Sequence, residues 1–199
     1  MQATAPGDDR LVALSREGDL PAFNALVEMY QGQVYNLCRR MLGVREAAED
    51  ATQEAFLAAY NNIRRFRGPS FRAWLFRIAA NAATDELRRR GRRPQVSLEA
   101  PFSDTETALD LPDRAPGPEE LALRSERARS MQAALLTLPP DQRLAVILAD
   151  VQGLSYEEVG QVMGSSLGTV KSRLSRGRGR LRHHLLEQGE LSPPGQRPI

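Results

Sequence analysis

Three stretches of this 199-residue sequence carry side chains whose types and spacing could do chemistry, and all three suit binding. An acidic and polar run occupies residues 46–54, aromatic residues alternate with arginines over 71–90, and six Lys or Arg side chains with no acid among them occupy 171–182. No stretch forms a phosphate-cradling glycine loop or a convincing pair of carboxylates for acid and base catalysis. The sequence therefore predicts a binding protein with no catalytic residue.

The cationic stretch belongs to two short helical patterns that meet at a polar turn. Ser155 and Glu158 have the spacing of a capping box that starts the first helix, and Gly164 is placed to end it. Ser166 can cap the second helix, and Gly160 leaves room where the two backbones cross. This pattern predicts a helix-turn-helix whose second helix enters the major groove of DNA. The alternative is an amphipathic hairpin whose basic face is merely solvated.

The acidic run lies early in a helical pattern over 46–66. Its members recur at spacings of three and four, so several project from one side of the helix: Glu46, Glu49, Asp50, Gln53 and Glu54. Acids in an early turn favour the helix dipole, which is a purely structural explanation. The functional alternative is a docking face for a basic partner.

The stretch that alternates aromatic residues with arginines suits single-stranded nucleic acid, because rings stack on bases while arginines follow the phosphates. Phe71, Trp74 and Phe76 are interspersed with Arg72 and Arg77. Aromatic residues at helical spacing also commonly pack inward, and for Trp74 burial in the core is the preferred interpretation.

Helical patterns elsewhere in the sequence must position these side chains. Apolar residues recur at helical spacing over 9–18, 19–43, 46–66, 71–90, 119–136 and 141–151. Asp19 can cap the second of these helices and Gly43 can end it. The predicted fold class is therefore all-α.

Residues 93–118 interrupt the helical pattern with prolines and acids. A loop of that length inside one compact domain would be unusual, so the sequence predicts two small helical domains joined by a flexible linker. The expected boundaries are 1–92, the linker 93–118, a helix-turn-helix domain over 119–187 and a disordered tail over 188–199. The acids of the linker could lie in a basic channel of a partner, shield the basic helices from non-specific DNA, or simply be solvated.

Charge is distributed unevenly although the net charge is only +2. Ten arginines lie between residues 64 and 93 against two acids, whereas seven carboxylates lie between 94 and 120 against the single Arg114. This distribution, rather than the total, favours a nucleic-acid partner.

Other features narrow the class of protein further. Cys38 is the only cysteine, which excludes an internal disulfide and indicates a buried apolar thiol. His183 and His184 stand in the basic helix as surface residues, so no metal or cofactor is expected. The first ten residues lack a targeting pattern, and no run approaches the roughly 18 apolar residues of a membrane span. We expect a soluble, cytoplasmic protein.

Together these residues resemble the extracytoplasmic-function group of bacterial sigma factors. The resemblance covers nearly all of residues 9–186 apart from the linker. Its motifs are EDATQEAFLAAY over 49–60, FRGPSFRAWLFRIAANAATDELRRR over 66–90, and LPPDQRLAVILADVQGLSYEEVGQVMGSSLGTVKSRLSRGRGRLR over 138–182. They are similar to the family's polymerase-docking helix, promoter-melting segment and carboxy-terminal helix-turn-helix, respectively.

The resemblance implies a role for each binding residue. The docking helix would engage the clamp coiled coil of the largest subunit of core RNA polymerase through Asp50, Gln53, Glu54 and Phe56. The "minus-ten" promoter element would be contacted by Arg67, Ser70, Phe71, Arg77, Asn81, Asp85 and Arg88. Asn81 would read a flipped non-template base, since its amide both donates and accepts.

The helix-turn-helix would read the "minus-thirty-five" element. The residues that the resemblance implies for this task are Ser166, Thr169, Lys171, Ser172, Arg173 and Arg176. Arginines can bind guanine bidentately, with about 1–3 kcal/mol of discrimination per good contact. Gly177 and Gly179 each cost about 1 kcal/mol in a helix relative to alanine, so we expect the recognition helix to fray early.

The function implied is that of an initiation factor that binds core RNA polymerase, directs it to promoters with both elements and aids DNA melting. Its partners would be the polymerase, duplex promoter DNA, the melted non-template strand and an inhibitory anti-sigma factor, with no membrane insertion. The alternative is a conventional helix-turn-helix regulator whose amino-terminal domain senses a ligand or partner. A structural adaptor would leave both basic stretches unexplained.

Overall fold

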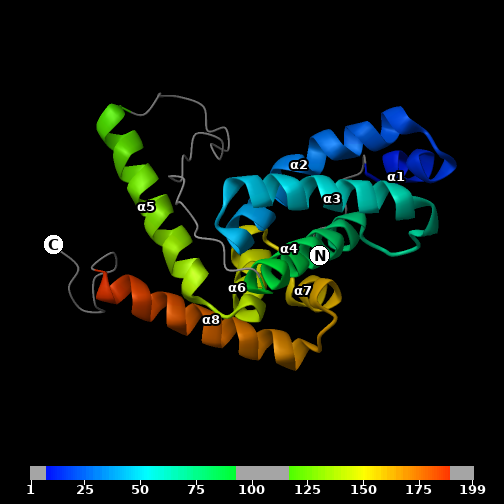
Figure 1. Cartoon of the computed structure of the whole chain (residues 1–199). Coiled ribbons are helices and arrows are strands. Elements are labelled where there is room, and N and C mark those ends of the chain that lie inside the picture. The colour runs from blue at the N-terminus through cyan, green and yellow to red at the C-terminus, as the bar shows by residue number, and fades with distance from the viewer. Residues whose placement is uncertain (1–7, 93–116, 189–199) are drawn as a thin grey trace.

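The computed structural model describes residues 8–92 and 117–188, and in those ranges the regular structure is helical throughout, which confirms the all-α prediction (Figure 1). In chain order the elements are α1 (Asp8–Glu17), α2 (Leu20–Leu42), α3 (Arg45–Asn62), the 3-10 turn η1 (Ile63–Arg65), α4 (Phe71–Arg92), α5 (Pro118–Thr137), α6 (Pro140–Val146), the π-helical turn η2 (Ile147–Val151), α7 (Tyr156–Met163) and α8 (Leu167–Glu187). The predicted linker and tail lie mostly outside the described residues.

The ends of the long helix α2 follow the expected local signals. The Asp19 carboxylate accepts a hydrogen bond from the Ala22 amide at 2.9 Å, which caps the start of the helix. Gly43 ends it with φ of +76°, a left-handed conformation that disfavours any residue with a Cβ.

Two helices differ from their predicted extents. The helix expected over 46–66 ends at Asn62, and η1 tightens the chain before Phe66. The helix expected over 141–151 begins at Pro140, where proline costs no hydrogen bond, and widens into η2. The Gln152 amide bonds the Ile147 carbonyl at 2.9 Å in this wider turn, a spacing of five that an apolar pattern does not reveal.

Helix α2 forms the centre of the N-terminal half of the molecule. One side of α3 that faces the interior consists of small residues, and all of them are buried: Ala47, Ala48, Ala51, Ala55 and Ala59. Small side chains let the α3 backbone approach α2 and α4 closely, and both helices pack against α3. Within the described ranges, no helix is long and apolar enough to cross a membrane.

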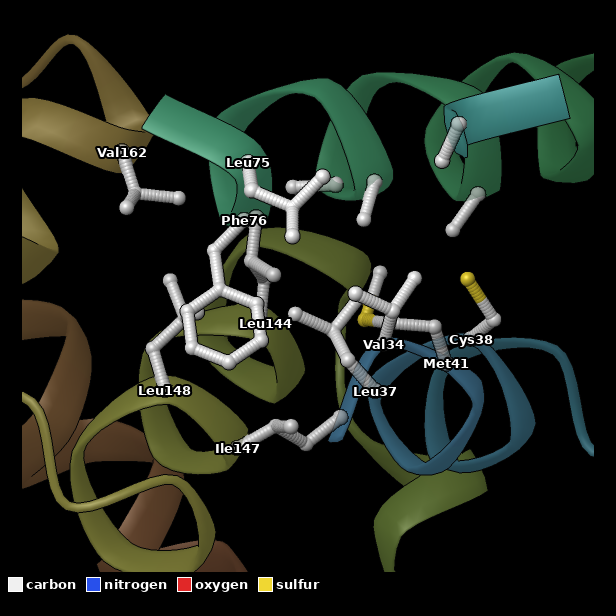
Figure 2. Close-up of a cluster of buried hydrophobic side chains, with 14 of the residues drawn as sticks. Val34, Leu37, Cys38, Met41, Leu75, Phe76, Leu144, Ile147, Leu148 and Val162 are labelled. Atoms are coloured by element: carbon white, nitrogen blue, oxygen red, sulfur yellow. The ribbon is translucent and has the colours of Figure 1, made fainter. Parts of the chain in front are cut away.

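The N-terminal helices α1–α4 and the C-terminal helices α5–α8 share one apolar core. Figure 1 shows α6 and α7 lying between α8 and the N-terminal helices, and α4 packs directly on α7. In Figure 2, Leu37 of α2 and Phe76 of α4 face Leu144, Ile147 and Leu148 of α6 and η2. The two predicted helical units are therefore in contact across an apolar interface.

Cys38 of α2 is completely buried, as the sequence indicates. Burial raises the pKa of its thiol to about 11, although a hydrogen bond with Thr52 opposes the shift. The thiol is therefore protonated and inaccessible in the folded protein at neutral pH.

This raised pKa predicts a loss of stability in alkali. An unfolded cysteine ionises near pH 8.5, so between about pH 8.5 and 11 the unfolded state releases a proton that the folded state retains. The free energy of unfolding should fall by about 1.4 kcal/mol per pH unit in this window, relative to the variant Cys38→Ala. Urea unfolding of both proteins from pH 8 to 11 measures the difference, and parallel pH profiles would contradict it.

Candidate functional site

The C-terminal half contains the predicted helix-turn-helix. The Ser155 hydroxyl accepts from the Glu158 amide at 3.2 Å, and the Glu158 carboxylate accepts from the Ser155 amide at 2.9 Å, which completes the capping box of α7. Gly164 ends α7 with φ of +58°. The Ser166 hydroxyl then caps α8 by accepting from the Thr169 amide at 3.3 Å.

Gly160 allows α7 and the turn to approach each other closely. A Cβ added at this position would lie 2.9 Å from the Ser165 carbonyl oxygen. Any side chain here would push the turn away from α7 and change the angle at which α8 leaves it. The sequence-based reason for a glycine at this position is confirmed.

The first turns of α8 present the polar face that the sequence predicts for DNA contact. Five of the six predicted side chains are exposed: Ser166, Thr169, Lys171, Ser172 and Arg176. Arg176 donates from Nε to the Ser172 carbonyl at 3.2 Å and from Nη2 to the Ser172 hydroxyl at 3.1 Å. These contacts are local to the helix surface and leave the face open to a partner.

Arg173 is the sixth predicted residue and differs from the others because it is half-buried. Its Nε lies 3.0 Å from the Asp141 carboxylate, and its Nη1 donates to the Ser165 hydroxyl at 2.7 Å. In this arrangement the guanidinium ties α8 to the start of α6 and to the turn. Arg173 therefore holds α8 in position.

Arg178 makes a similar tie further along α8, and sequence reasoning missed it. Its Nε and Nη2 both contact the Asp150 carboxylate, at 3.0 and 2.5 Å, and Nη1 donates to the Tyr156 hydroxyl at 3.2 Å. The hydrogen bonds to Asp150 and then Tyr156 raise the pKa of Arg178. The partners lie 28 and 22 positions away, so no local pattern could have indicated them.

Helix α8 continues to Glu187, so the prediction that it frays early is wrong. Gly177 is buried where α8 crosses α6, and an added Cβ would lie 2.9 Å from Val146 Cγ2 and 3.3 Å from the Gln142 carbonyl. The close crossing offsets the poor helix propensity of this glycine. Gly179, in contrast, faces open space.

Helix α3 carries the predicted acidic face. Asp50, Gln53 and Glu54 are all exposed, on the side of the helix away from its buried alanines. Phe56 is only partly exposed and packs against the core, so it supports this face and contributes little open surface. The geometry leaves a compact anionic and polar surface for a cationic partner.

The loop before α4 is held in place by its own contacts. Arg67 donates from Nη1 to the carbonyls of Arg64 and Phe66, each at 2.8 Å, and the Ser70 hydroxyl caps α4 by accepting from the Ala73 amide at 3.2 Å. The Arg67 side chain is exposed and Ser70 is half-exposed, so both can still be reached by a partner.

Phe71 is 3% exposed and packs in an aromatic cluster with Phe66, Trp74 and Tyr30. The prediction that Phe71 contacts DNA does not agree with this burial, because the ring supports the loop from below. Trp74 is half-buried against Phe66 at 5.0 Å between ring centroids, which agrees with the preferred interpretation of this residue.

The remaining predicted residues of α4 form an exposed row. Arg77, Asn81 and Asp85 recur every four positions and are exposed, and Arg88 follows one turn later. The Asp85 carboxylate lies 3.0 Å from Arg88 Nη1. An amide flanked by an arginine on one side and an ion pair on the other is suited to reading a base edge beside phosphates.

His183 is exposed and contacts Glu187 at 3.2 Å, as expected for a surface residue, whereas His184 is half-buried, so the surface prediction holds for His183 alone. Among the described residues, no cluster of His, Cys, Asp or Glu has the arrangement of a metal site.

Two protein-family models match this chain, one in each half. Residues 26–93 match the family described as Sigma-70 region 2, and residues 128–181 match Sigma-70, region 4. The RNA polymerase sigma-H factor of Pseudomonas aeruginosa is 39% identical over 181 residues, which cover 88% of this chain and 92% of that protein. The chain belongs to the extracytoplasmic-function family of RNA polymerase sigma factors.

Other sigma factors show the same likeness. The ECF sigma factor SigW of Bacillus subtilis is 38% identical over 85% of this chain and 92% of its own length. SigE of Mycolicibacterium smegmatis is 39% identical, and the match spans 87% of this chain but only 65% of that longer protein.

Two solved structures with the same fold contain a second protein. The sigma factor RpoE of Bartonella quintana in complex with the anti-sigma factor NepR matches with a TM-score of 0.66 and 27% identity, over 82% of this chain and 96% of that chain. CnrH in complex with the cytosolic domain of CnrY matches with a TM-score of 0.65 and 27% identity, over 92% and 99%. The alternative of a conventional regulator with a sensing domain is not favoured, because a sigma region fills the N-terminal half.

The contrast between Gly177 and Gly179 of this sigma factor gives a matched pair of predictions. Gly179→Ala should stabilise the protein by about 0.5–1 kcal/mol, because alanine is the better helix former and meets no neighbour. Gly177→Ala should destabilise it by about 1–3 kcal/mol, because the added methyl group overpacks the crossing with α6. Thermal unfolding of both variants compares them, and equal shifts would contradict the packing role of Gly177.

Proposed function

We propose that this sigma factor binds core RNA polymerase, directs it to promoters with minus-ten and minus-thirty-five elements, and aids DNA melting without catalysing a reaction itself. The observation that carries the proposal is the placement of two exposed surfaces of opposite charge on different halves of the molecule. The anionic surface is on α3, and the cationic surface is on α8. One protein that must hold both another protein and DNA needs two such surfaces.

The docking surface consists of Asp50, Gln53 and Glu54, together with the partly buried Phe56 of the same helix. Its polymerase partner would be the clamp coiled coil of the largest subunit, by analogy with the family. Rigid support favours this assignment, since α3 is anchored by its buried alanine face and its polar face needs no rearrangement to bind.

The minus-ten element would meet α4 and the loop before it. Arg77, Asn81, Asp85 and Arg88 supply the exposed row, and Arg67 and Ser70 supply the loop. Asn81 would read the flipped non-template base, and the arginines would follow the phosphates of the melted strand. Phe71 would act only by supporting the loop.

The minus-thirty-five element would meet the exposed start of α8. The exposed Lys171, Ser172 and Arg176 would reach base edges and phosphates, with Ser166 and Thr169 at the amino end of the helix, where its dipole favours phosphate. Arg173 would hold α8 in position. It could contact a DNA base only after breaking its ion pair with Asp141.

The same proposal has consequences for the protein's compartment, its cofactor requirement, its inhibitor and its division into domains. It would act in the cytoplasm, where core polymerase and promoters are found, and no cofactor is required. An anti-sigma factor would inhibit it, as the complex of the structurally similar RpoE with the anti-sigma factor NepR suggests. The N-terminal half over 1–92 and the C-terminal half over 119–187 would serve as the two functional domains, joined by 93–118.

Charge reversal on the docking surface tests the proposal directly. Asp50→Arg combined with Gln53→Ala should abolish capture of core polymerase, because like charges would face each other across the interface. Glu28→Arg changes an exposed acid on α2 by the same amount and should leave capture intact. Pull-down of purified core polymerase gives the measurement, and undiminished binding by the double variant would sink the docking assignment.

The salt dependence of promoter binding distinguishes a cationic side chain that contacts DNA from one that only holds α8 in position. In the holoenzyme on duplex promoter DNA, Lys171→Gln should weaken binding and reduce the slope of log K against log salt by about 0.9, one phosphate contact. Arg178→Gln should weaken binding with the slope unchanged, because Arg178 acts through Asp150 and Tyr156. Titrations from low to moderate salt give both slopes. A reduced slope for Arg178→Gln would place that residue on the DNA instead.

A further inference from the structure

Two ion pairs join α8 to the segment formed by α6 and η2. Arg173 pairs with Asp141 at the start of α6, and Arg178 pairs with Asp150 in η2. Asp150 accepts from two nitrogens of Arg178, whereas Asp141 accepts from Nε of Arg173 alone. The second partner of Arg173 is the neutral hydroxyl of Ser165. Because a carboxylate held by two nitrogens binds an arginine more strongly, Arg173 is the less firmly held of the two cations.

Arg173 also lies beside the exposed residues of α8 that are proposed to contact DNA. It follows Thr169 by four positions and precedes Arg176 by three, so it is a neighbour of both on the helix surface. Its side chain is 24% exposed, and the side chain of Asp141 is 48% exposed. The ion pair therefore stands at the edge of the proposed DNA-contacting face and is partly open to solvent.

An arginine paired in this way adds little attraction for DNA. Affinity for duplex DNA rises with the number of phosphates that cationic side chains neutralise, because each neutralised phosphate releases bound counterions. The pair of Arg173 and Asp141 has no net charge. If the guanidinium turned to a phosphate, the Asp141 carboxylate would be left unpaired beside a polyanion, and the repulsion would offset the new contact. Asp141 therefore keeps one cation of α8 out of the attraction to phosphates.

The attraction to phosphates is the part of DNA binding that does not depend on sequence. Phosphates carry the same charge on every sequence, so an additional phosphate contact strengthens binding to all sites alike. The ion pair also fixes α8 against the start of α6, and a fixed helix presents its base-contacting side chains in one orientation. Loss of the Asp141 carboxylate would thus add affinity for any sequence and remove part of the advantage of the correct one.

Asp141 also has a simpler structural explanation. It lies in the first turn of α6, where the helix dipole favours an acid, and an ion pair that stabilises the fold needs no role in DNA binding. The two explanations predict different results. A structural role alone leaves the attraction between α8 and phosphates unchanged when the carboxylate is removed, whereas a role in DNA binding increases it.

We infer that Asp141 is a specificity-determining residue that acts through Arg173. It limits the sequence-independent binding of α8 to DNA and holds the helix in the position that reads the minus-thirty-five element. This inference rests on the proposed function, because it assumes that α8 contacts that element. It adds an acid of α6 to the residues that decide promoter choice, although Asp141 itself does not touch DNA.

Removal of the Asp141 charge in the holoenzyme tests the inference. Asp141→Asn keeps the size of the side chain, and binding is measured on two duplexes: a promoter that the parent holoenzyme transcribes, and the same promoter with its minus-thirty-five element scrambled. Core polymerase makes the same contribution with every variant, so differences in affinity and in salt slope arise from the sigma factor. Glu157→Gln is the matched control, because Glu157 is an exposed acid in the first turn of α7 and has no ion pair among the described residues.

On the scrambled duplex, Asp141→Asn should bind roughly tenfold more tightly than the parent at low salt, with a slope of log K against log salt that is steeper by about 0.9, because the released Arg173 neutralises one more phosphate. On the intact promoter the gain should be smaller, so the preference for the intact element should fall by about threefold or more, because α8 is less firmly held. Adding Arg173→Gln to Asp141→Asn should return the slope to the parent value, since the cation and its acid are then both absent. Glu157→Gln should leave the preference unchanged.

Three results would overturn the inference while leaving the proposed function intact. Weaker binding of Asp141→Asn to the intact promoter with unchanged binding to the scrambled duplex would leave Asp141 a structural role alone. A gain no larger than that of Glu157→Gln would be a general effect of charge, and a gain that survived Arg173→Gln would not act through Arg173. A parent holoenzyme with no preference for the intact element would instead contradict the proposed role of α8, and the inference with it.

Discussion

The apolar stripe along α2 is the constraint on which the rest of the structure depends. Val34, Leu37 and Met41 are completely buried, and they are covered from more than one direction. Helices α3 and α4 pack on α2 within the N-terminal half, while α5, α6 and η2 reach it from the C-terminal half. Because apolar side chains occupy much of the circumference of α2, several helices must pack around it to bury them.

This arrangement explains why the surfaces with proposed binding roles are rigid before any partner arrives. Buried alanines on the inner side of α3 pack against α2 and α4, and this packing also fixes the position of the acids on the outer side of α3. Helix α8 is fixed by Gly177 at its crossing with α6 and by Arg173 and Arg178, which are paired with Asp141 and Asp150. Binding then costs little side-chain and backbone ordering on these faces.

Much of the fold could be predicted from local signals. Capping by Asp19, Ser155 and Ser166 and left-handed glycines at Gly43 and Gly164 depend on a few neighbouring residues, and the structure agrees with each. Helical spacing located α2, α3, α4 and α5 to within a few residues, and the exposed acidic row on α3 followed from the same periodicity. The exposed residues proposed for DNA contact on α4 and α8 were instead implied by the family resemblance.

The features that could not be predicted all depend on contacts between distant positions. The continuity of α8 through Gly177 requires the presence of Val146 on another helix, which intrinsic propensity ignores. The burial of Phe71 depends on Tyr30 and Phe66, and the tie from Arg178 to Asp150 joins residues 28 positions apart. The packing of the two halves against each other is another such feature. An apolar face in the sequence indicates that the face is buried, but not which helix buries it.

The arginines of this protein show why charge along a sequence is a weak guide to function by itself. Arg143 is buried on backbone carbonyls, Arg173 and Arg178 are paired with carboxylates, and Arg77 and Arg176 project from exposed rows. A cation with a carboxylate partner in its own fold must give up that pairing before it can neutralise a phosphate, whereas an exposed cation gives up only water and counterions. The unevenly distributed charge therefore divides into one set that holds the helices in place and another that is exposed and, under the proposed function, faces DNA. That division, rather than the number of arginines, limits which positions can contribute to promoter affinity.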